Sequence, residues 1–152
     1  TIFMPGMTGP PWVEGSLLPL TDSGHIQVDE RAKVPGLDAV YAVGDSAAFP
    51  GPPWQAKQAH AAEVQAGTAA TNLVAELSGK QPRQTVRHEI VCILDDLRTG
   101  VLVFRNSRAQ IVLPPMIPGH LGKVAMERLF LYKYGPRGGR TARPSRGSPA
   151  HA

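Results

Sequence analysis

The pattern of apolar and polar positions in the first half of the chain predicts two strands followed by a long helix. In residues 24–30 every second side chain is apolar, as in a strand with one buried face. Residues 39–43 are apolar almost without interruption, which indicates a buried strand. Residues 57–77 contain many alanines and no proline, and the stretch ends at Ser78-Gly79. Glycine is a common stop signal, so one long helix is predicted there.

The second half of the chain has shorter apolar runs and predicts a separate small sheet. Residues 88–94, 100–105 and 110–113 predict three strands joined by polar turns. Residues 121–134 predict a helix with one apolar and one polar face. The remaining residues, 135–152, are rich in Gly, Pro, Ser and Arg, and are expected to form a disordered basic tail.

These elements predict an α/β protein with three parts. Residues 1–79 form an α/β region, residues 80–134 form a small domain of antiparallel sheet and helix, and residues 135–152 form the tail. The chain starts at Thr1 inside an apolar run, with no methionine and no leader-like segment. We therefore expect it to be the C-terminal part of a longer protein.

Cysteine content and charge exclude some classes of protein. Cys92 is the only cysteine, so an internal disulfide and a multi-cysteine zinc module are excluded, and no metal site is predicted. No apolar run reaches the length of a membrane-spanning helix. Residues 1–79 carry eight acidic and three basic side chains, whereas the residues from 80 onward have a net charge of +9. An acidic half is therefore joined to a basic half.

The segment around Gly44 and Asp45 carries the most specific chemistry. Asp45 follows the predicted strand 39–43, and ligands bind at the carboxyl ends of strands in open α/β sheets. Its carboxylate can accept hydrogen bonds from sugar or ribityl hydroxyls, and Gly44 allows the backbone close to a ligand. The helix that follows directs unpaired N–H groups toward the same place, which favours an electron-rich group.

The sequence DSGHIQVDERAKVPGLDAVYAVGD, residues 22–45, resembles the second flavin-contacting motif of flavoproteins with two dinucleotide-binding domains. The resemblance implies the C-terminal portion of a Rossmann-like FAD/NAD(P)-binding fold with FAD as cofactor. Gly44 and Asp45 then belong to the cofactor site, with Asp45 on the ribityl chain. Lys57 and Gln58, at the start of the helix, then lie against the isoalloxazine. A solvated first-turn lysine is the alternative for Lys57.

Further positions resemble the sulfide:quinone oxidoreductase and flavocytochrome c sulfide dehydrogenase group. The matching residues are Lys57, Glu63, Gln65, Cys92, Pro114, Pro115, His120, Lys123, Glu127, Phe130 and Lys133. In that group two cysteines flank the flavin and pass on sulfide sulfur, which implies that Cys92 is catalytic. A buried, inert Cys92 is the alternative. The G-x-G-x-x-G fingerprint and a second cysteine are not in these 152 residues.

The same resemblance implies the partners. Sulfide and quinone are the expected substrates, and helix 121–134 is expected to touch a bacterial or archaeal inner membrane peripherally. No motif supports a specific nucleic acid, and a homo-oligomer is allowed. One alternative is a type II NADH dehydrogenase or another NAD(P)H-dependent flavoprotein, which needs no Cys92. The other is a truncated, non-catalytic binding or membrane-association module. Alone, the chain is expected to be inactive and to retain little or no FAD.

Overall fold

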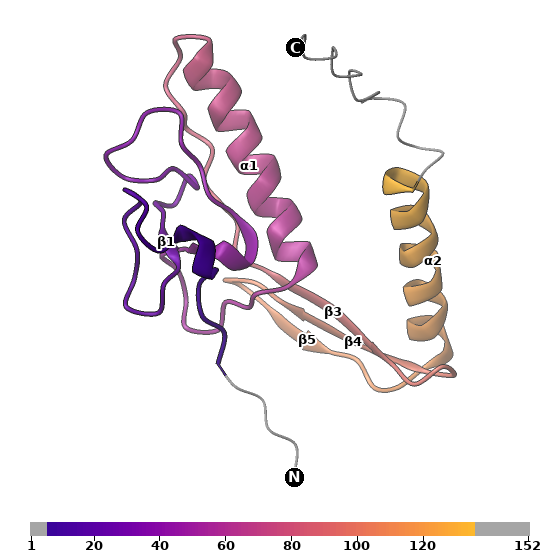
Figure 1. The fold of residues 1–152 in the computed structure, drawn as a ribbon. Helices are drawn as coiled ribbons and strands as arrows, with labels where there is room; N and C mark the ends of the chain where they lie inside the picture. The colour runs from indigo at the N-terminus through magenta and orange to yellow at the C-terminus, as the bar shows by residue number, and fades with distance from the viewer. Residues whose placement is uncertain (1–5, 136–152) are drawn as a thin grey trace, which may run out of the picture. The chain divides into compact units, whose positions relative to one another are not determined.

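The computed structural model describes residues 6–135, and these residues divide into two units (Figure 1). The first unit contains the described residues up to Val91 together with Phe104–Gln110. The second contains Cys92–Val103 and the described residues from Ile111 onward. The boundary therefore crosses the three-stranded sheet, whose strands contribute residues to both units.

The described residues form a mixed α/β structure, so the broad fold class is confirmed. Both long helices and the small antiparallel sheet are present. In chain order the elements are the 3-10 helix η1 (Pro11–Val13), β1 (Ile26–Gln27), the 3-10 helix η2 (Gly44–Ser46), β2 (Ala47–Ala48), α1 (Ala59–Leu77), β3 (Ile90–Asp95), β4 (Gly100–Arg105), β5 (Gln110–Val112) and α2 (Ile117–Tyr134).

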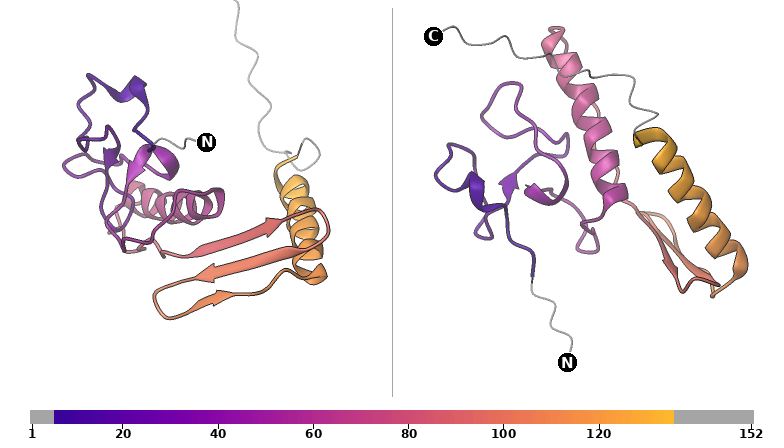
Figure 2. Two further views of the ribbon diagram at one scale, coloured as in Figure 1. Left: turned by 90° about the horizontal axis from the view of Figure 1, so that it is seen from below. Right: turned by 45° about the vertical axis from the view of Figure 1, so that its right-hand side comes forward.

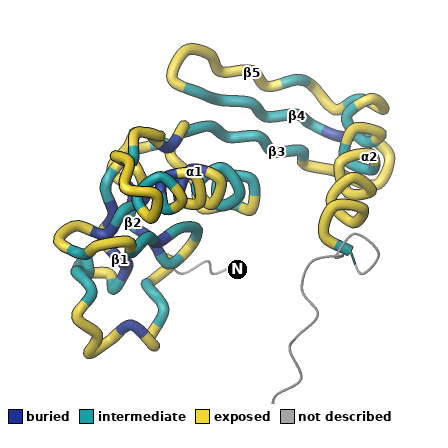
Figure 3. Tube along the Cα trace, turned by 90° about the horizontal axis from the view of Figure 1, so that it is seen from above, coloured by how far each residue is buried: buried dark blue, intermediate teal, exposed yellow. Residues whose placement is uncertain are grey.

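The core of the first unit is built mainly from loops around the short parallel pair β1–β2 (Figure 3). Ile26 of β1 lies opposite Ala47 of β2, and both side chains are buried. α1 adds one buried apolar residue, Ala69. Because regular elements supply so few core residues, turns and side-chain hydrogen bonds carry much of the architecture. The buried apolar residues are Val13, Ile26, Val28, Ala32, Val34, Ala42, Ala47, Phe49, Ala69 and Val86.

The two strands predicted in the first half are mostly not formed. Of the strand predicted over residues 24–30, only the two residues of β1 are formed. The strand predicted over residues 39–43 is absent, so the second prediction is wrong. Ala39 has φ +54°, a left-handed conformation that interrupts any extended run. Val34 N–H then donates to Val40 O at 2.9 Å, which folds the apolar segment back on its own chain. Asp45 consequently lies in η2 and not at the carboxyl end of a long strand.

Helix α1 confirms the long helix predicted after the proline-rich loop. It begins at Ala59, two residues later than predicted, because Gln58 is extended with φ −155°. Lys57 therefore precedes the helix and is not a first-turn residue. The helix ends at Leu77, and Gly79 follows with φ +70°, the left-handed conformation that glycine adopts readily after a helix. The predicted stop signal is thus confirmed.

Glu76, near the end of α1, fastens the helix to the loop that precedes the Gly-Asp segment. Its carboxylate accepts hydrogen bonds from Lys33 Nζ at 2.6 Å, Tyr41 Oη at 2.7 Å and the Ala39 N–H at 3.2 Å. The bond from Lys33 and then that from Tyr41 lower the pKa of Glu76 to about 2. Burial, followed by the bond to Glu76, raises the pKa of Tyr41 to about 12.

Replacing Glu76 by glutamine should remove part of the acid sensitivity of the fold. The folded-state pKa of Glu76 lies below its ordinary value, so ionised Glu76 stabilises the fold above about pH 4.5. That stabilisation is lost as the pH falls toward 2. Urea unfolding followed by tryptophan fluorescence should find E76Q less stable than wild type at neutral pH and equally stable near pH 2. E14Q, at an exposed loop position, is the control. An E76Q deficit that stays constant with pH contradicts this assignment.

The strands β3, β4 and β5 are adjacent in that order and antiparallel (Figure 2). In the second unit Gly100 of β4 meets Gly119 of α2 so closely that a Cβ on Gly119 would lie 2.1 Å from Gly100 O. Met116 also bonds to Gly100 through both backbone groups. α2 starts at Ile117, four residues earlier than predicted, because Pro118 lies in the first turn, where proline is tolerated.

The predicted basic tail and the predicted three-part division of the chain are not tested by the described residues. The predicted basic tail lies outside the described residues apart from Gly135, and the division into 1–79, 80–134 and 135–152 stays a prediction. Among residues 6–135, neither long helix has the combination of length and apolar character needed to cross a bilayer.

Candidate cofactor site

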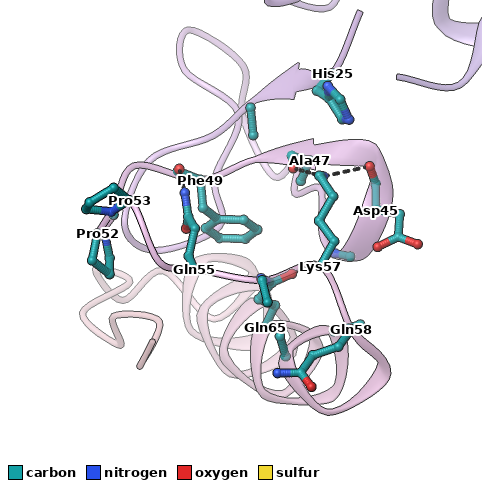
Figure 4. Close-up of a pocket in the computed structure, with 16 residues that line it drawn as sticks. His25, Asp45, Ala47, Phe49, Pro52, Pro53, Gln55, Lys57, Gln58 and Gln65 are labelled. Carbon is teal, nitrogen blue, oxygen red and sulfur yellow. Dashed lines mark hydrogen bonds between the residues drawn. The ribbon is translucent and has the colours of Figure 1, made fainter. Parts of the chain in front are cut away.

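A cavity of about 460 Å³ opens in the first unit at the N-terminal end of α1 (Figure 4). Its walls come from four places: the residue before β1, the η2–β2 turn, the proline-rich segment after β2, and the first turns of α1. Phe49, Pro52 and Pro53 give it apolar surface. Small-molecule and cofactor sites commonly measure roughly 300–1,000 Å³ and combine apolar walls with a few polar groups. This cavity has both properties.

The structure brings four of the five predicted site residues together. Gly44 and Asp45 line the cavity on one side, and Lys57 and Gln58 line it where the chain enters α1. Cys92 does not line it: the thiol lies on β3, partly buried, in the second unit. The predicted link between Cys92 and the flavin therefore stays a prediction.

Gly44 holds the Gly-Asp segment against the helix. Its φ of +68° is a left-handed conformation that favours glycine, and an added Cβ would contact Ala62 Cβ at 3.5 Å. The Gly44 N–H donates to Gln65 Oε1 at 2.7 Å. Glycine is thus favoured here by the turn, whereas an added Cβ would make only an ordinary contact with α1, and Asp45 follows directly as an exposed residue.

Lys57 connects the two sides of the cavity. Its ammonium donates to the backbone oxygens of Asp45 and Ala47, each at 2.9 Å (Figure 4). Burial lowers the pKa of Lys57, and the charge of Asp45 partly opposes that shift. Lys57 therefore places a positive charge beside the backbone carbonyls of the η2–β2 turn, at the edge of the cavity. The sequence suggested either a flavin contact or a solvated first-turn residue for Lys57. Neither interpretation predicted that Lys57 stabilises the η2–β2 turn through hydrogen bonds to two of its backbone oxygens.

The start of α1 leaves backbone donors beside the cavity. Gln58 is the N-cap, and its side chain makes no capping hydrogen bond. The first N–H groups of a helix have no intrahelical partner and carry partial positive charge. Ala61 and Ala62, in the first turn, line the cavity with small side chains, so a ligand can approach the backbone closely. The helix end thus suits an electron-rich group.

Sequence reasoning missed His25. It lines the cavity, only 6% of its surface is exposed, and neither burial nor a ligand role was predicted. The alternation over 24–30 groups His25 with Gln27, on the polar side of a strand. Because β1 is only two residues long, that alternation does not extend to His25. No local sequence signal distinguishes His25 from the other polar residues of this alternating segment.

A second polar cluster lies beside the cavity but does not belong to it. Glu89 accepts a hydrogen bond from His60 Nε2 at 2.8 Å. It also forms an ion pair with Arg87, whose Nε lies 2.8 Å from the carboxylate. The bond from His60, and then that from Arg87, lower the pKa of Glu89 despite its partial burial. His60 and Arg87 both pair with Glu89, so the cluster ties the first turn of α1 to the segment before β3.

Neither a protein-family model nor a curated protein matches this chain. Function is therefore inferred from the residues and the cavity themselves.

Proposed function

We propose that this chain contributes the ribityl and isoalloxazine side of an FAD site in an oxidoreductase of the sulfide:quinone oxidoreductase type. One observation carries the proposal. Gly44 and Asp45 were selected from one motif and Lys57 and Gln58 from the start of a helix, and all four border a single cavity. A strand-ending turn without a ligand role would not require that arrangement.

The residues present fit a flavin in three respects. The exposed Asp45 carboxylate is suited to ribityl hydroxyls. The start of α1 and the Lys57 ammonium favour negative charge, which a reduced flavin carries on its pyrimidine end. The side chains of His25 and Gln58 each hold a buried nitrogen without a partner among the described residues. When bound, a flavin supplies two-electron redox chemistry.

The chain's own residues would bind and position the cofactor. Asp45 orients the ribityl chain, Lys57 holds the η2–β2 turn in place through two carbonyls, and Phe49 and the prolines exclude water from one wall. The G-x-G-x-x-G fingerprint that binds a dinucleotide pyrophosphate does not occur in these 152 residues, so the proposed contacts are confined to the ribityl chain and the ring.

Helix α2 supports the proposed peripheral contact with a membrane. None of its residues is buried, and Lys123, Arg128 and Lys133 accompany its apolar side chains. Interfacial helices combine apolar residues with basic ones in this way. Residues 129–132 are four consecutive apolar residues, and successive residues of a helix project in different directions around its axis. Near the C-terminal end of α2 the apolar surface therefore extends beyond a single face. Its exposed large apolar residues are Ile117, Leu121, Met126, Leu129, Phe130, Leu131, Tyr132 and Tyr134.

Riboflavin tests the proposed site, because it contains the ribityl chain and ring system but no pyrophosphate. Saturable quenching of riboflavin fluorescence is expected with the wild-type chain, and D45A should bind about tenfold more weakly, as expected when a hydrogen-bonding charge is lost. D38A, another exposed aspartate, should bind like wild type. Adenosine should not compete, and the purified chain should retain little FAD. Absence of riboflavin binding by wild type would falsify the proposal.

A further inference from the structure

His25 has a buried ring nitrogen directed at no other group of the described chain. The residue is 94% buried, as its exposed fraction is 6%, and its Nε2 has no hydrogen-bond partner. The only other buried side-chain nitrogen or oxygen in that condition among residues 6–135 is Gln58 Nε2. Both residues line the same cavity, and in Figure 4 they lie on opposite sides of Lys57. An unpaired buried polar group destabilises the fold, and a bound ligand that hydrogen-bonds to it can recover that free energy.

The opposite nitrogen of the ring is held by a short chain of hydroxyls. Ser23 Oγ lies 2.9 Å from His25 Nδ1, and Thr21 Oγ1 lies 3.0 Å from Ser23 Oγ. Thr21 Oγ1 also accepts the His25 backbone N–H at 3.1 Å. If Thr21 donates to Ser23 and Ser23 donates to Nδ1, every one of these groups has a protein partner. In that arrangement the proton of the neutral ring is on Nε2.

The surroundings of His25 keep its ring neutral. Burial lowers the pKa of His25, and the positive charge of Lys57 lowers it further, with Asp45 acting in the opposite direction. At neutral pH the side chain therefore offers a single uncharged N–H donor. A neutral donor suits a carbonyl oxygen on an uncharged ring.

We propose that His25 donates from Nε2 to a ring carbonyl oxygen of the ligand in this cavity, with the amide nitrogen of Gln58 as a second donor. The matching ligand class is a heteroaromatic ring with imide-type carbonyls. Identifying that ring as a flavin rests on the proposed function, whereas the donor role of His25 does not. His25 is not one of the four predicted residues that border the cavity, so it adds a ligand contact from the β1 side of the cavity.

Two probes separate the two proposals: riboflavin, and uracil, which carries the imide carbonyls without the rest of a flavin. In long-range proton–nitrogen spectra of the chain labelled with nitrogen-15 histidine, His25 Nε2 should be the protonated nitrogen. Its resonance should shift saturably with either probe. S23A should increase the population of the other tautomer. H25F should bind riboflavin about tenfold more weakly, and H120F, at a histidine paired with Asp95 in the second unit, should bind normally.

Each outcome is decisive for one proposal. If riboflavin binds while the His25 resonance stays fixed, or H25F binds as wild type does, the His25 assignment is overturned and the flavin proposal stands. If uracil shifts Nε2 but riboflavin does not bind, the His25 assignment stands and the flavin proposal fails. An unprotonated Nε2 in the free chain, or no shift with either probe, overturns the assignment even if H25F fails to fold.

Discussion

Replacing Cys92 by serine should reduce sulfide-dependent quinone reduction by at least about a thousandfold, the scale of losing an attacking nucleophile. The reason is chemical: sulfide sulfur can bond to a cysteine sulfur when two electrons pass to an acceptor, here the proposed flavin and then quinone, and a serine hydroxyl offers no sulfur for that bond. Cys92 lies partly buried on β3 between Val91 and Ile93. Serine nearly matches cysteine in size, so the strand should be retained and the loss should be specific to the reaction.

The measurement uses the protein that carries this sequence, with sulfide and NADH as alternative electron donors to a soluble quinone. Sulfide-dependent activity that is lost in C92S while bound flavin is unchanged supports the thiol role. Activity retained in C92S contradicts it. Quinone reduction from NADH alone, insensitive to C92S, identifies the NAD(P)H-dependent alternative. A protein that binds flavin but reduces quinone with neither donor supports the non-catalytic module.

Replacing Asn72 by alanine should destabilise the first unit by about 3 kcal/mol, because buried polar groups lose their partners. Only 1% of Asn72 is exposed. Its Nδ2 donates to Arg31 O at 3.0 Å and to Gln84 O at 2.7 Å, and its Oδ1 accepts the Gln84 N–H at 2.9 Å. One side chain on α1 therefore satisfies three backbone groups from two separate loops.

Urea unfolding reported by tryptophan fluorescence measures this effect, since Trp12 and Trp54 both lie in the first unit. T71A is the matched control: Thr71 is the neighbouring, exposed residue of α1, and its loss should change the free energy of unfolding by less than about 0.5 kcal/mol. N72D keeps one acceptor but removes both donors, so it should also be destabilised. An N72A variant as stable as T71A would show that the three hydrogen bonds are replaced by water.

Local sequence signals were sufficient for the long helix and for the small sheet. α1 and its stop at Gly79 follow from alanine content, the absence of proline and a terminal glycine. The three strands from 90 to 112 follow from short apolar runs separated by turns. Gly44 and Asp45 were identified by their order in a long motif, and both line the cavity at the start of α1. These features depend on residues close together in the chain.

The remaining features depend on contacts between distant residues, so only the tertiary structure decided them. The apolar run 39–43 reads as a buried strand, yet a left-handed Ala39 and the attachment of Glu76 fold it into a turn. Trp12 is a large apolar residue, yet 73% of it is exposed, and the adjacent Val13 is buried instead.

The site shows the same division between local and distant contacts. The sequence by itself determined that Gly44, Asp45, Lys57 and Gln58 are candidate ligand contacts. The tertiary structure decided that Lys57 braces the η2–β2 turn through two backbone carbonyls. It also decided that His25, over thirty residues from Gln58 in sequence, faces the same cavity. Periodicity reports which side of a regular element a residue occupies, and this unit has few regular elements, so burial and side-chain direction followed from long-range hydrogen bonds.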